Sequence, residues 1–204
     1  MTEQKEKKLE DIKKEAEQYK CLVQKSCYFI AEFLSGPMCG KCFPCSLGSY
    51  EARIRLKNII KGRGTEADLL AIKRIATEML DSSMCKKGKD TAVYMSESIE
   101  LSPYIEHISG VCRDKECLSL IKYIIIPEQC IICGDCQDVC KDNAIIGEKK
   151  KSYLSSYLPF EIVQKRCTKC GECIKVCPYG AIEIVDIKAK VDAEVEKKQV
   201  KVEV

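Results

Sequence analysis

The stretches CIICGDCQDVCKDNAI at residues 130–145 and CTKCGECIKVCPYGAI at residues 167–182 are two copies of one pattern and align without a gap. Each copy has the spacing C-x2-C-x2-C-x3-C, and the second continues into Pro178. At this spacing one loop presents three cysteines to a cubane cluster, whereas the fourth cysteine faces the other way and reaches a second cluster. The pattern therefore predicts two [4Fe–4S] clusters with crossed ligand sets: Cys130, Cys133, Cys136 and Cys177 for one, and Cys167, Cys170, Cys173 and Cys140 for the other.

Zinc is the alternative metal for these cysteines. Structural zinc sites use C-x2-C pairs with four ligands per ion, so a third cysteine in both copies is not needed for zinc. The repeats closely resemble the bacterial two-cluster ferredoxin fold. They depart from it at Lys141, where that family usually has proline. A cation there would stabilise the reduced cluster and raise its potential, whereas full solvation of the lysine would leave the potential unchanged, and both interpretations stay open.

Composition limits where the protein works. The chain has 204 residues, 16 cysteines and no tryptophan, which allows one or two small domains. The charged amino terminus MTEQKEKKLE lacks the apolar core of a signal peptide, and no apolar run reaches the length of a membrane span. We therefore expect a cytoplasmic, reducing location, in which dense cysteines favour metal binding over disulfides.

The charge and the residue types exclude several functions. The formal net charge of +3 counts ligand thiols as neutral. With the third cluster that is predicted below, three oxidised clusters at roughly −2 each, thiolates included, would give a holoprotein of about −3, so nucleic-acid binding is not indicated. A single histidine argues against a Ser–His–Asp triad, and the C-x3-C-x2-C pattern of radical-SAM centres is absent. These features favour a non-catalytic electron-transfer subunit.

A helical region precedes the repeats. An apolar seam with coiled-coil-like spacing predicts one long helix over residues 4–34, which needs a partner helix. Further helices are expected at about 46–60, from a capping box at Thr65–Asp68 to Ser82, and near 90–101 and 103–108. The motif CGKCFPC at residues 39–45 is a third C-x2-C-x2-C, and Cys85 follows where two antiparallel helices return the chain to it.

The strings SGPMCGKCFPCSLG at residues 35–48 and SMCKKG at residues 83–88 carry a family resemblance. They resemble the iron–sulfur helical domain of the flavoprotein (F-type) subunit of respiratory NADH dehydrogenase. They resemble still more the beta, or diaphorase, subunits of electron-bifurcating hydrogenases and related formate dehydrogenases, which append a two-cluster ferredoxin domain in the order seen here. The resemblance covers roughly residues 20–186 and implies a third [4Fe–4S] cluster on Cys39, Cys42, Cys45 and Cys85, with zinc as the alternative.

The sequence departs from that family in one large respect. The family subunits carry a flavin and NAD(H)-binding domain with a glycine-rich loop ahead of the bundle. This sequence begins at the bundle and has no G-x-G-x-x-G after a strand, since Gly62–Gly64 is an isolated turn. We therefore expect the flavin, NAD(P)H-linked as in the family, to belong to a partner subunit.

Four cysteines remain outside these motifs: Cys21, Cys27, Cys112 and Cys117. His107, Cys112 and Cys117 form H-x4-C-x4-C, and a similar C-x4-C occurs at this junction in the hydrogenase beta subunits. Cys21 begins CLVQ, which resembles a CMVD at the same place in those proteins. Three thiolates and an imidazole suit a closed zinc site, whereas packed free cysteines are the equally weighted alternative. Cys27 is expected to pack in the bundle.

The predicted fold class is α+β, with an antiparallel helical bundle carrying one cluster followed by a ferredoxin-like two-cluster domain. We divide the chain into a helical extension (1–20), the bundle (21–108), a linker with the zinc candidate (109–127), the ferredoxin domain (128–187) and a charged tail (188–204). Strands are expected at 118–126 and 182–185, with a long connection over 148–159 that forms a surface hairpin or a docking surface.

The predicted function is that of an iron–sulfur subunit of a cytoplasmic, multi-subunit oxidoreductase. It would relay electrons between a partner's flavin and a further redox subunit or soluble ferredoxin, with oxygen sensitivity and an anaerobic host as a hypothesis. The alternatives are a free-standing polyferredoxin shuttle and a scaffold with structural metals. The terminal donor and acceptor do not follow from the sequence.

Overall fold

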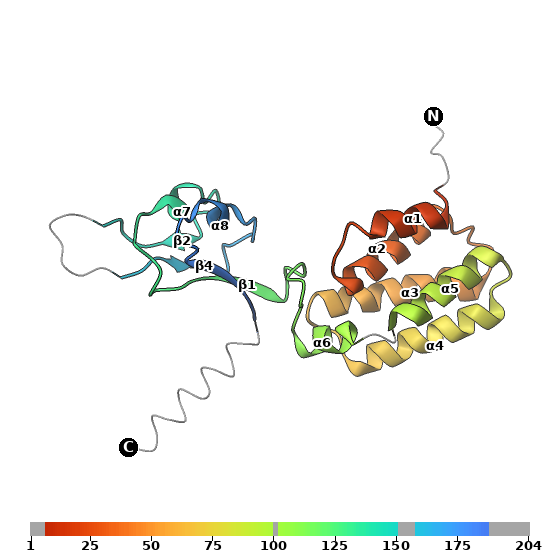
Figure 1. The fold of residues 1–204 in the computed structure, drawn as a ribbon. Helices are drawn as coiled ribbons and strands as arrows, with labels where there is room; N and C mark the ends of the chain where they lie inside the picture. Colours follow the sequence, from red (N-terminus) through yellow and green to blue (C-terminus); the bar gives the residue numbers. More distant parts are fainter. Residues whose placement is uncertain (1–6, 100–101, 151–157, 188–204) are drawn as a thin grey trace, which may run out of the picture. The chain divides into compact units, whose positions relative to one another are not determined.

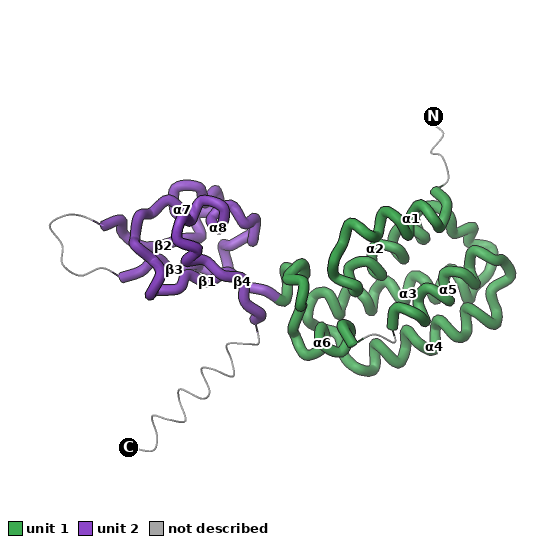
Figure 2. The backbone as a smooth tube through the Cα atoms, viewed as in Figure 1, with its two compact units in different colours: residues 1–120 green, residues 121–204 purple. Residues whose placement is uncertain are grey.

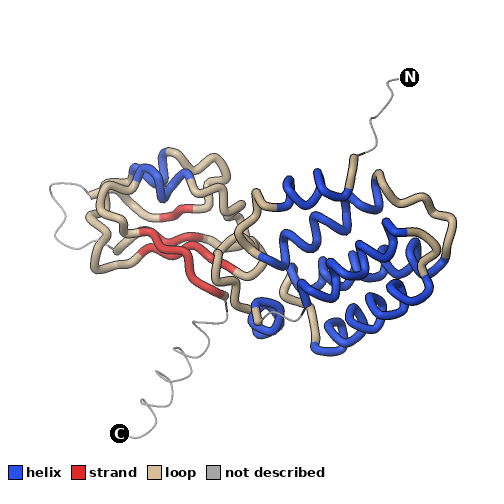
Figure 3. The backbone as a smooth tube through the Cα atoms, turned by 45° about the vertical axis from the view of Figure 1, so that its right-hand side comes forward, coloured by secondary structure: helices blue, strands red, loops and turns tan. Residues whose placement is uncertain are grey.

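The computed structural model describes residues 7–99, 102–150 and 158–187, and the chain divides into two compact units, residues 1–120 and 121–204 (Figure 2). The first contains helices α1 to α6, and the second contains β1, α7, β2, β3, α8 and β4 in that order (Figure 1). Every strand found in the described residues lies in the second unit (Figure 3). The α+β prediction, a helical domain followed by a ferredoxin-like domain, is confirmed. The division falls within the expected linker.

The helical unit is built on four long helices: α2 (Leu22–Ser35), α3 (Phe43–Ile60), α4 (Glu66–Ser82) and α5 (Lys86–Ile99). Helices adjacent in sequence also pack together, α2 with α3, α3 with α4 and α4 with α5. The expected capping box opens α4, because the Asp68 amide donates to Thr65 Oγ1 at 3.4 Å and the Thr65 amide donates to Asp68 Oδ2 at 2.9 Å. The core consists of fully buried apolar side chains, among them Phe29, Ile30, Phe33, Leu56, Ile72 and Met79.

The prediction of one continuous helix over residues 4–34 was wrong. The structure has α1 (Leu9–Ala16) and α2, with Cys21 in an extended conformation at the start of α2; residues 4–6 lie outside the described ranges. The segment between them contains no glycine or proline. The break coincides with a tertiary contact, since the amides of Lys20 and Cys21 both donate to the Glu116 carboxylate, at 3.0 and 2.8 Å. The predicted seam finds its partner in the same chain, because α1 packs on α2.

A short helix, α6 (Pro103–Ser109), closes the bundle and ends at Gly110 in a left-handed conformation with φ of 88°. A loop then leads to β1 (Ile121–Ile125), which is shorter than the strand expected over 118–126. None of the helices in the described ranges is both long and apolar enough to cross a bilayer.

The second unit reproduces the sequence repeat in its strands. β1 pairs with β4 (Ile182–Asp186) in antiparallel register, with Ile125 opposite Ile182, and β2 (Ile145–Ile146) pairs with β3 (Glu161–Ile162), with Ile145 opposite Ile162. Each repeat also has one short helix, α7 (Asp135–Asp138) or α8 (Glu172–Val176). The core joins strand residues such as Ile145 and Ile162 to the cysteines of both repeats. Most of the connection over 148–159, namely residues 151–157, and the tail over 188–204 lie outside the described residues.

Candidate metal centres

The two cysteine loops share an unusual backbone conformation. Ile132 and Gly134 in the first loop have φ values of 63° and 88°, and the corresponding Lys169 and Gly171 in the second have 61° and 82°. Left-handed backbone is unfavourable for a β-branched residue such as Ile132. The recurrence of this conformation at the same position of both loops points to a functional constraint. The turns curl each loop so that its three cysteines line one cavity.

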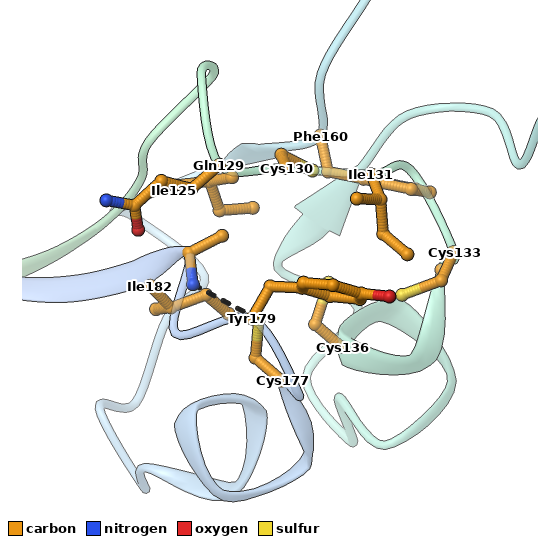
Figure 4. A pocket seen from close by; sticks show the side chains of 12 residues that line it. Ile125, Gln129, Cys130, Ile131, Cys133, Cys136, Phe160, Cys177, Tyr179 and Ile182 are labelled. Atoms are coloured by element: carbon orange, nitrogen blue, oxygen red, sulfur yellow. Dashed lines mark hydrogen bonds between the residues drawn. The ribbon is translucent and has the colours of Figure 1, made fainter.

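The first cavity is lined by Cys130, Cys133, Cys136 and Cys177, three cysteines of the first repeat and the last cysteine of the second (Figure 4). Its remaining wall is mainly apolar, with Ile125, Ile131, Phe160, Tyr179 and Ile182. The Ala181 amide donates to Cys177 Sγ at 3.3 Å, the dashed line in Figure 4. Sulfur-directed N–H groups and an apolar wall are features that tune the potential of a cluster.

The second cavity has the crossed composition. It is lined by Cys167, Cys170 and Cys173 of the second repeat and by Cys140 of the first. The Ala144 amide donates to Cys140 Sγ at 3.3 Å, which repeats the contact at Cys177. The hydrogen bond from Lys175, and then the charges of Lys175 and Lys141, lower the pKa of the Glu172 carboxyl, which lines this cavity. Lys141, the departure from the ferredoxin pattern, thus contributes positive charge to this region.

The spacing of the sulfurs distinguishes a cluster from a single ion. Among the described residues, only the group Cys21, His107, Cys112 and Cys117 has all its ligand atoms within 4.8 Å of one another. The eight ferredoxin cysteines instead line two cavities, four in each, and a cluster of several metal atoms requires such a space between its ligands. Burial, reinforced by the neighbouring cysteines, raises the pKa of Cys136 and of Cys173 to about 11. Metal binding must therefore displace protons from these thiols.

The bundle cysteines converge from two parts of the helical unit. Cys42 immediately precedes α3, Cys45 lies in the first turn of α3, and Cys85 immediately precedes α5. Burial first, and then the charges of Cys42, Cys85 and Cys39, raise the pKa of Cys45 to about 11. A Cβ atom added to Gly88 of α5 would lie 3.3 Å from Cys45 Sγ, so the first turn of α5, which follows Cys85, packs against Cys45. Two apolar side chains beside these cysteines, Phe43 and Met84, are each 83% exposed.

The remaining predicted set forms a compact buried group in the first unit. Cys21, His107, Cys112 and Cys117 are all buried, with His107 Nε2 at 3.2 Å from Cys21 Sγ and 3.3 Å from Cys117 Sγ. The Cys21 and Cys117 sulfurs are 3.7 Å apart. A tetrahedral zinc ion with Zn–S bonds of about 2.3 Å requires neighbouring sulfurs about 3.8 Å apart. The donor set therefore fits zinc in type and spacing. Cys27 is buried outside this group.

Contacts around this group were not anticipated from the sequence. His107 Nδ1 lies 2.6 Å from the Pro103 carbonyl oxygen, which favours the tautomer that carries the proton on Nδ1 and leaves Nε2 free to bind a metal. Gln24 Nε2 lies 3.6 Å from Cys117 Sγ. Glu116 holds the amides of Lys20 and Cys21, as described above. The adjacency of Glu116 to Cys117 was the only available sequence signal.

Comparison with known proteins finds one family match in each of the two units. Residues 25–101 match the family model of the NADH-ubiquinone oxidoreductase-F iron-sulfur binding region. Residues 129–181 match the 4Fe-4S dicluster domain. The first match contains Cys39, Cys42, Cys45 and Cys85, and the second contains all eight cysteines of the repeats.

Similar proteins are subunits of larger oxidoreductases. The NADP-reducing hydrogenase subunit HndC of Solidesulfovibrio fructosivorans is 32% identical over 136 residues, which is 65% of this chain and 28% of HndC. The F subunit of the NADH-quinone oxidoreductase of Streptomyces coelicolor is 35% identical over 81 residues, 39% of this chain and 18% of that protein. The NADP(+)-dependent formate dehydrogenase subunit beta of Moorella thermoacetica is 32% identical over 80 residues, 36% of this chain and 11% of that protein. The chain thus spans less than a third of each of these relatives.

Proposed function

We propose that this chain, an iron–sulfur electron-transfer subunit related to the F subunit of NADH-quinone oxidoreductase and to hydrogenase and formate dehydrogenase subunits, relays electrons through three [4Fe–4S] clusters. The electrons pass between a partner's flavin, NAD(P)H-linked, and another redox subunit or soluble ferredoxin. The observation that carries the proposal is the crossed lining of the two cavities, each by three cysteines of one repeat and one of the other.

The chain's own residues have three tasks in this function. Bound clusters supply one-electron transfer without making or breaking substrate bonds. The cysteines hold them: Cys130, Cys133, Cys136 and Cys177 in one site, Cys167, Cys170, Cys173 and Cys140 in another, and Cys39, Cys42, Cys45 and Cys85 in the bundle. The amides of Ala144 and Ala181 stabilise the charge on two ligand sulfurs. Apolar side chains such as Ile125 and Phe160 limit the access of water.

Exposed apolar side chains support a role within a complex over that of a free-standing shuttle. Phe43 and Met84 lie within three residues of bundle cysteines and are each 83% exposed, and Leu47 on α3 is 58% exposed. Apolar surface of this kind beside a redox centre favours coverage by another protein. If the protein purified from its host under native conditions has a mass above that of one chain, the role within a complex is supported. A stable monomer that reduces soluble acceptors unaided supports the polyferredoxin shuttle.

We propose in addition a structural zinc ion on Cys21, His107, Cys112 and Cys117. The support is the burial of all four ligands together with ligand-atom separations within 4.8 Å. A closed four-ligand site has no open position for substrate, so the ion would connect the start of α2 to α6 and the loop that follows α6.

The test is metal and acid-labile sulfide analysis of anaerobically purified protein, with EPR after dithionite reduction. The proposal expects about twelve irons and about one zinc per chain, and a spectrum of interacting reduced clusters. About eight irons with two or more zincs would assign zinc to the bundle cysteines. Iron that cannot be reduced would refute electron transfer and leave a structural scaffold.

A further inference from the structure

Lys149 lies across the first cysteine loop. A Cβ atom added to Gly134 would come within 2.4 Å of Lys149 Cε and 2.6 Å of its Cγ, so the lysine stem rests directly on the loop backbone beside Cys133. Its Nζ donates to Asp138 Oδ2 at 2.6 Å. The next amide, that of Lys150, donates to the Ile132 carbonyl at 3.3 Å. The start of the long connection between the repeats is therefore held against the first loop by both side chain and backbone.

The second repeat has no such arrangement. A Cβ on Gly171, the counterpart of Gly134, would meet only the Tyr123 hydroxyl, at 3.6 Å. The residue that corresponds to Lys149 is Asp186, which ends β4 opposite Ile121. The counterpart of Asp138 is Lys175, which pairs with Glu172 at 2.7 Å. The lysine over the loop is therefore a feature of the first repeat alone and breaks the symmetry of the two centres.

Lys149 lies near two negatively charged side chains that follow the first loop. Asp135 and Asp138 belong to α7, which begins directly after Gly134 and contains Cys136. The hydrogen bond to Asp138 is the largest cause that raises the pKa of Lys149, and the charges of Asp138, Asp135 and Cys133 act in the same direction, so the ammonium is charged at neutral pH. Reduction adds one negative charge to a cluster. A neighbouring carboxylate opposes that charge, and a neighbouring ammonium stabilises it.

We propose that Lys149 raises the reduction potential of the cluster bound by Cys130, Cys133, Cys136 and Cys177. Its positive charge would offset the negative charges of the Asp135 and Asp138 carboxylates. The inference rests on the proposed function, because it requires a cluster in this cavity. It assigns a role to the connection between the repeats: its first residues tune one centre of the electron path without contributing a ligand.

Solvent limits the size of the effect. The side chains of Lys149 and Asp138 are 48% and 57% exposed, so water and salt screen part of the interaction. We expect loss of the lysine charge to change the ratio of reduced to oxidised cluster at a fixed potential by about three- to tenfold. For a one-electron couple this corresponds to a midpoint shift of about 30 to 60 mV.

The test is an EPR-monitored redox titration of the full-length anaerobic protein, comparing wild type with K149Q, K149R, K150Q and D138N. K149Q should lower one ferredoxin midpoint and leave the other unchanged, and K149R should restore the wild-type value because it keeps the charge. K150Q is the matched control, since it removes an adjacent charge without removing the contact to Gly134, and should produce at most a small shift. D138N should shift the same midpoint upward, because it leaves Lys149 without its offsetting carboxylate.

The possible results separate this inference from the function on which it rests. Wild-type protein without reducible iron would refute the proposed function. Reducible clusters whose midpoints are unchanged in K149Q, or shifted equally in K150Q, would overturn the role of Lys149 alone. A D138N shift in the same direction as K149Q would indicate a structural effect of the ion pair and would also overturn the proposal. A K149Q shift that shrinks as salt concentration rises supports the electrostatic origin.

Discussion

Replacement of His107 by alanine should release the proposed zinc ion and destabilise the helical unit. The ligand atoms are already within 4.8 Å of one another, and the Cys21–Cys117 sulfur separation of 3.7 Å is close to the roughly 3.8 Å of a tetrahedral zinc site. Because the ligands need little rearrangement to bind zinc, we expect most of the free energy of zinc binding to add to the free energy of unfolding of the helical unit. With free zinc at about 1,000 times the dissociation constant, binding stabilises the folded unit by about 4 kcal/mol.

The expected change in melting temperature follows from the size of the unit. The helical unit comprises residues 1–120. For a domain of this size, 1 kcal/mol corresponds to roughly 3 to 5 °C, so loss of zinc should lower its melting temperature by about 15 °C. The assay is zinc and iron analysis combined with thermal unfolding followed by circular dichroism. H107A should lose its zinc and keep about twelve irons.

Two controls separate loss of zinc from loss of packing. C27S removes a buried thiol outside the four-residue group, and it should keep the zinc. A zinc chelator should lower the melting temperature of wild type and leave that of H107A unchanged. Wild-type protein that contains no zinc when zinc is supplied would refute the reasoning, as would H107A protein that binds as much zinc as C27S.

Three further predictions concern other parts of the chain. C85S should reduce iron from about twelve to about eight per chain, measured by metal analysis, whereas unchanged iron would remove Cys85 from the ligand set. Burial raises the pKa of Tyr104 to about 12, so its contribution to stability is complete below pH 10 and is lost between pH 10 and 12. The free energy of unfolding, measured in urea, should fall by about 3 kcal/mol less in Y104F than in wild type between pH 10 and 12. A pH profile identical to that of wild type would contradict a raised pKa of Tyr104. G64A should destabilise the bundle by about 2 to 3 kcal/mol, because the new Cβ would lie 2.7 Å from the backbone Cα of Ile59. G36A is its control, since that Cβ would make only an ordinary contact at 3.7 Å with the Glu32 carbonyl oxygen, and equal unfolding energies would refute the steric argument.

The cysteine loops were predictable because their chemistry is local. Three cysteines at every third position belong to one turn of backbone, so the spacing alone predicts which three line a cavity. The fourth cysteine of each gap-free repeat, Cys140 or Cys177, is predicted to reach the opposite site, and the structure places it in the lining of that cavity. The helices α3 and α4 were predictable for a similar reason, since caps and apolar periodicity act within a few residues.

The break between α1 and α2 was not predictable in this way. Residues 17–21 contain no helix-breaking residue, yet the chain is extended at Cys21. The Glu116 carboxylate accepts the amides of Lys20 and Cys21, and Cys21 Sγ lies beside His107. These partners are more than 80 residues away in the chain. Local propensity carries no information about such contacts, and here tertiary contacts overrode it.

The sequence by itself determined which cysteines are the candidate cluster ligands and the order of the two domains, because cysteine spacing and apolar periodicity are properties of short segments. Only the tertiary structure decided which of the remaining side chains lie near the candidate ligands. It brought Glu116 to the start of α2 and laid Lys149 over Gly134, contacts that depend on how loops return to distant backbone. The cysteines of one loop are neighbours in sequence, whereas the charges and hydrogen-bond partners around them depend on neighbours in space.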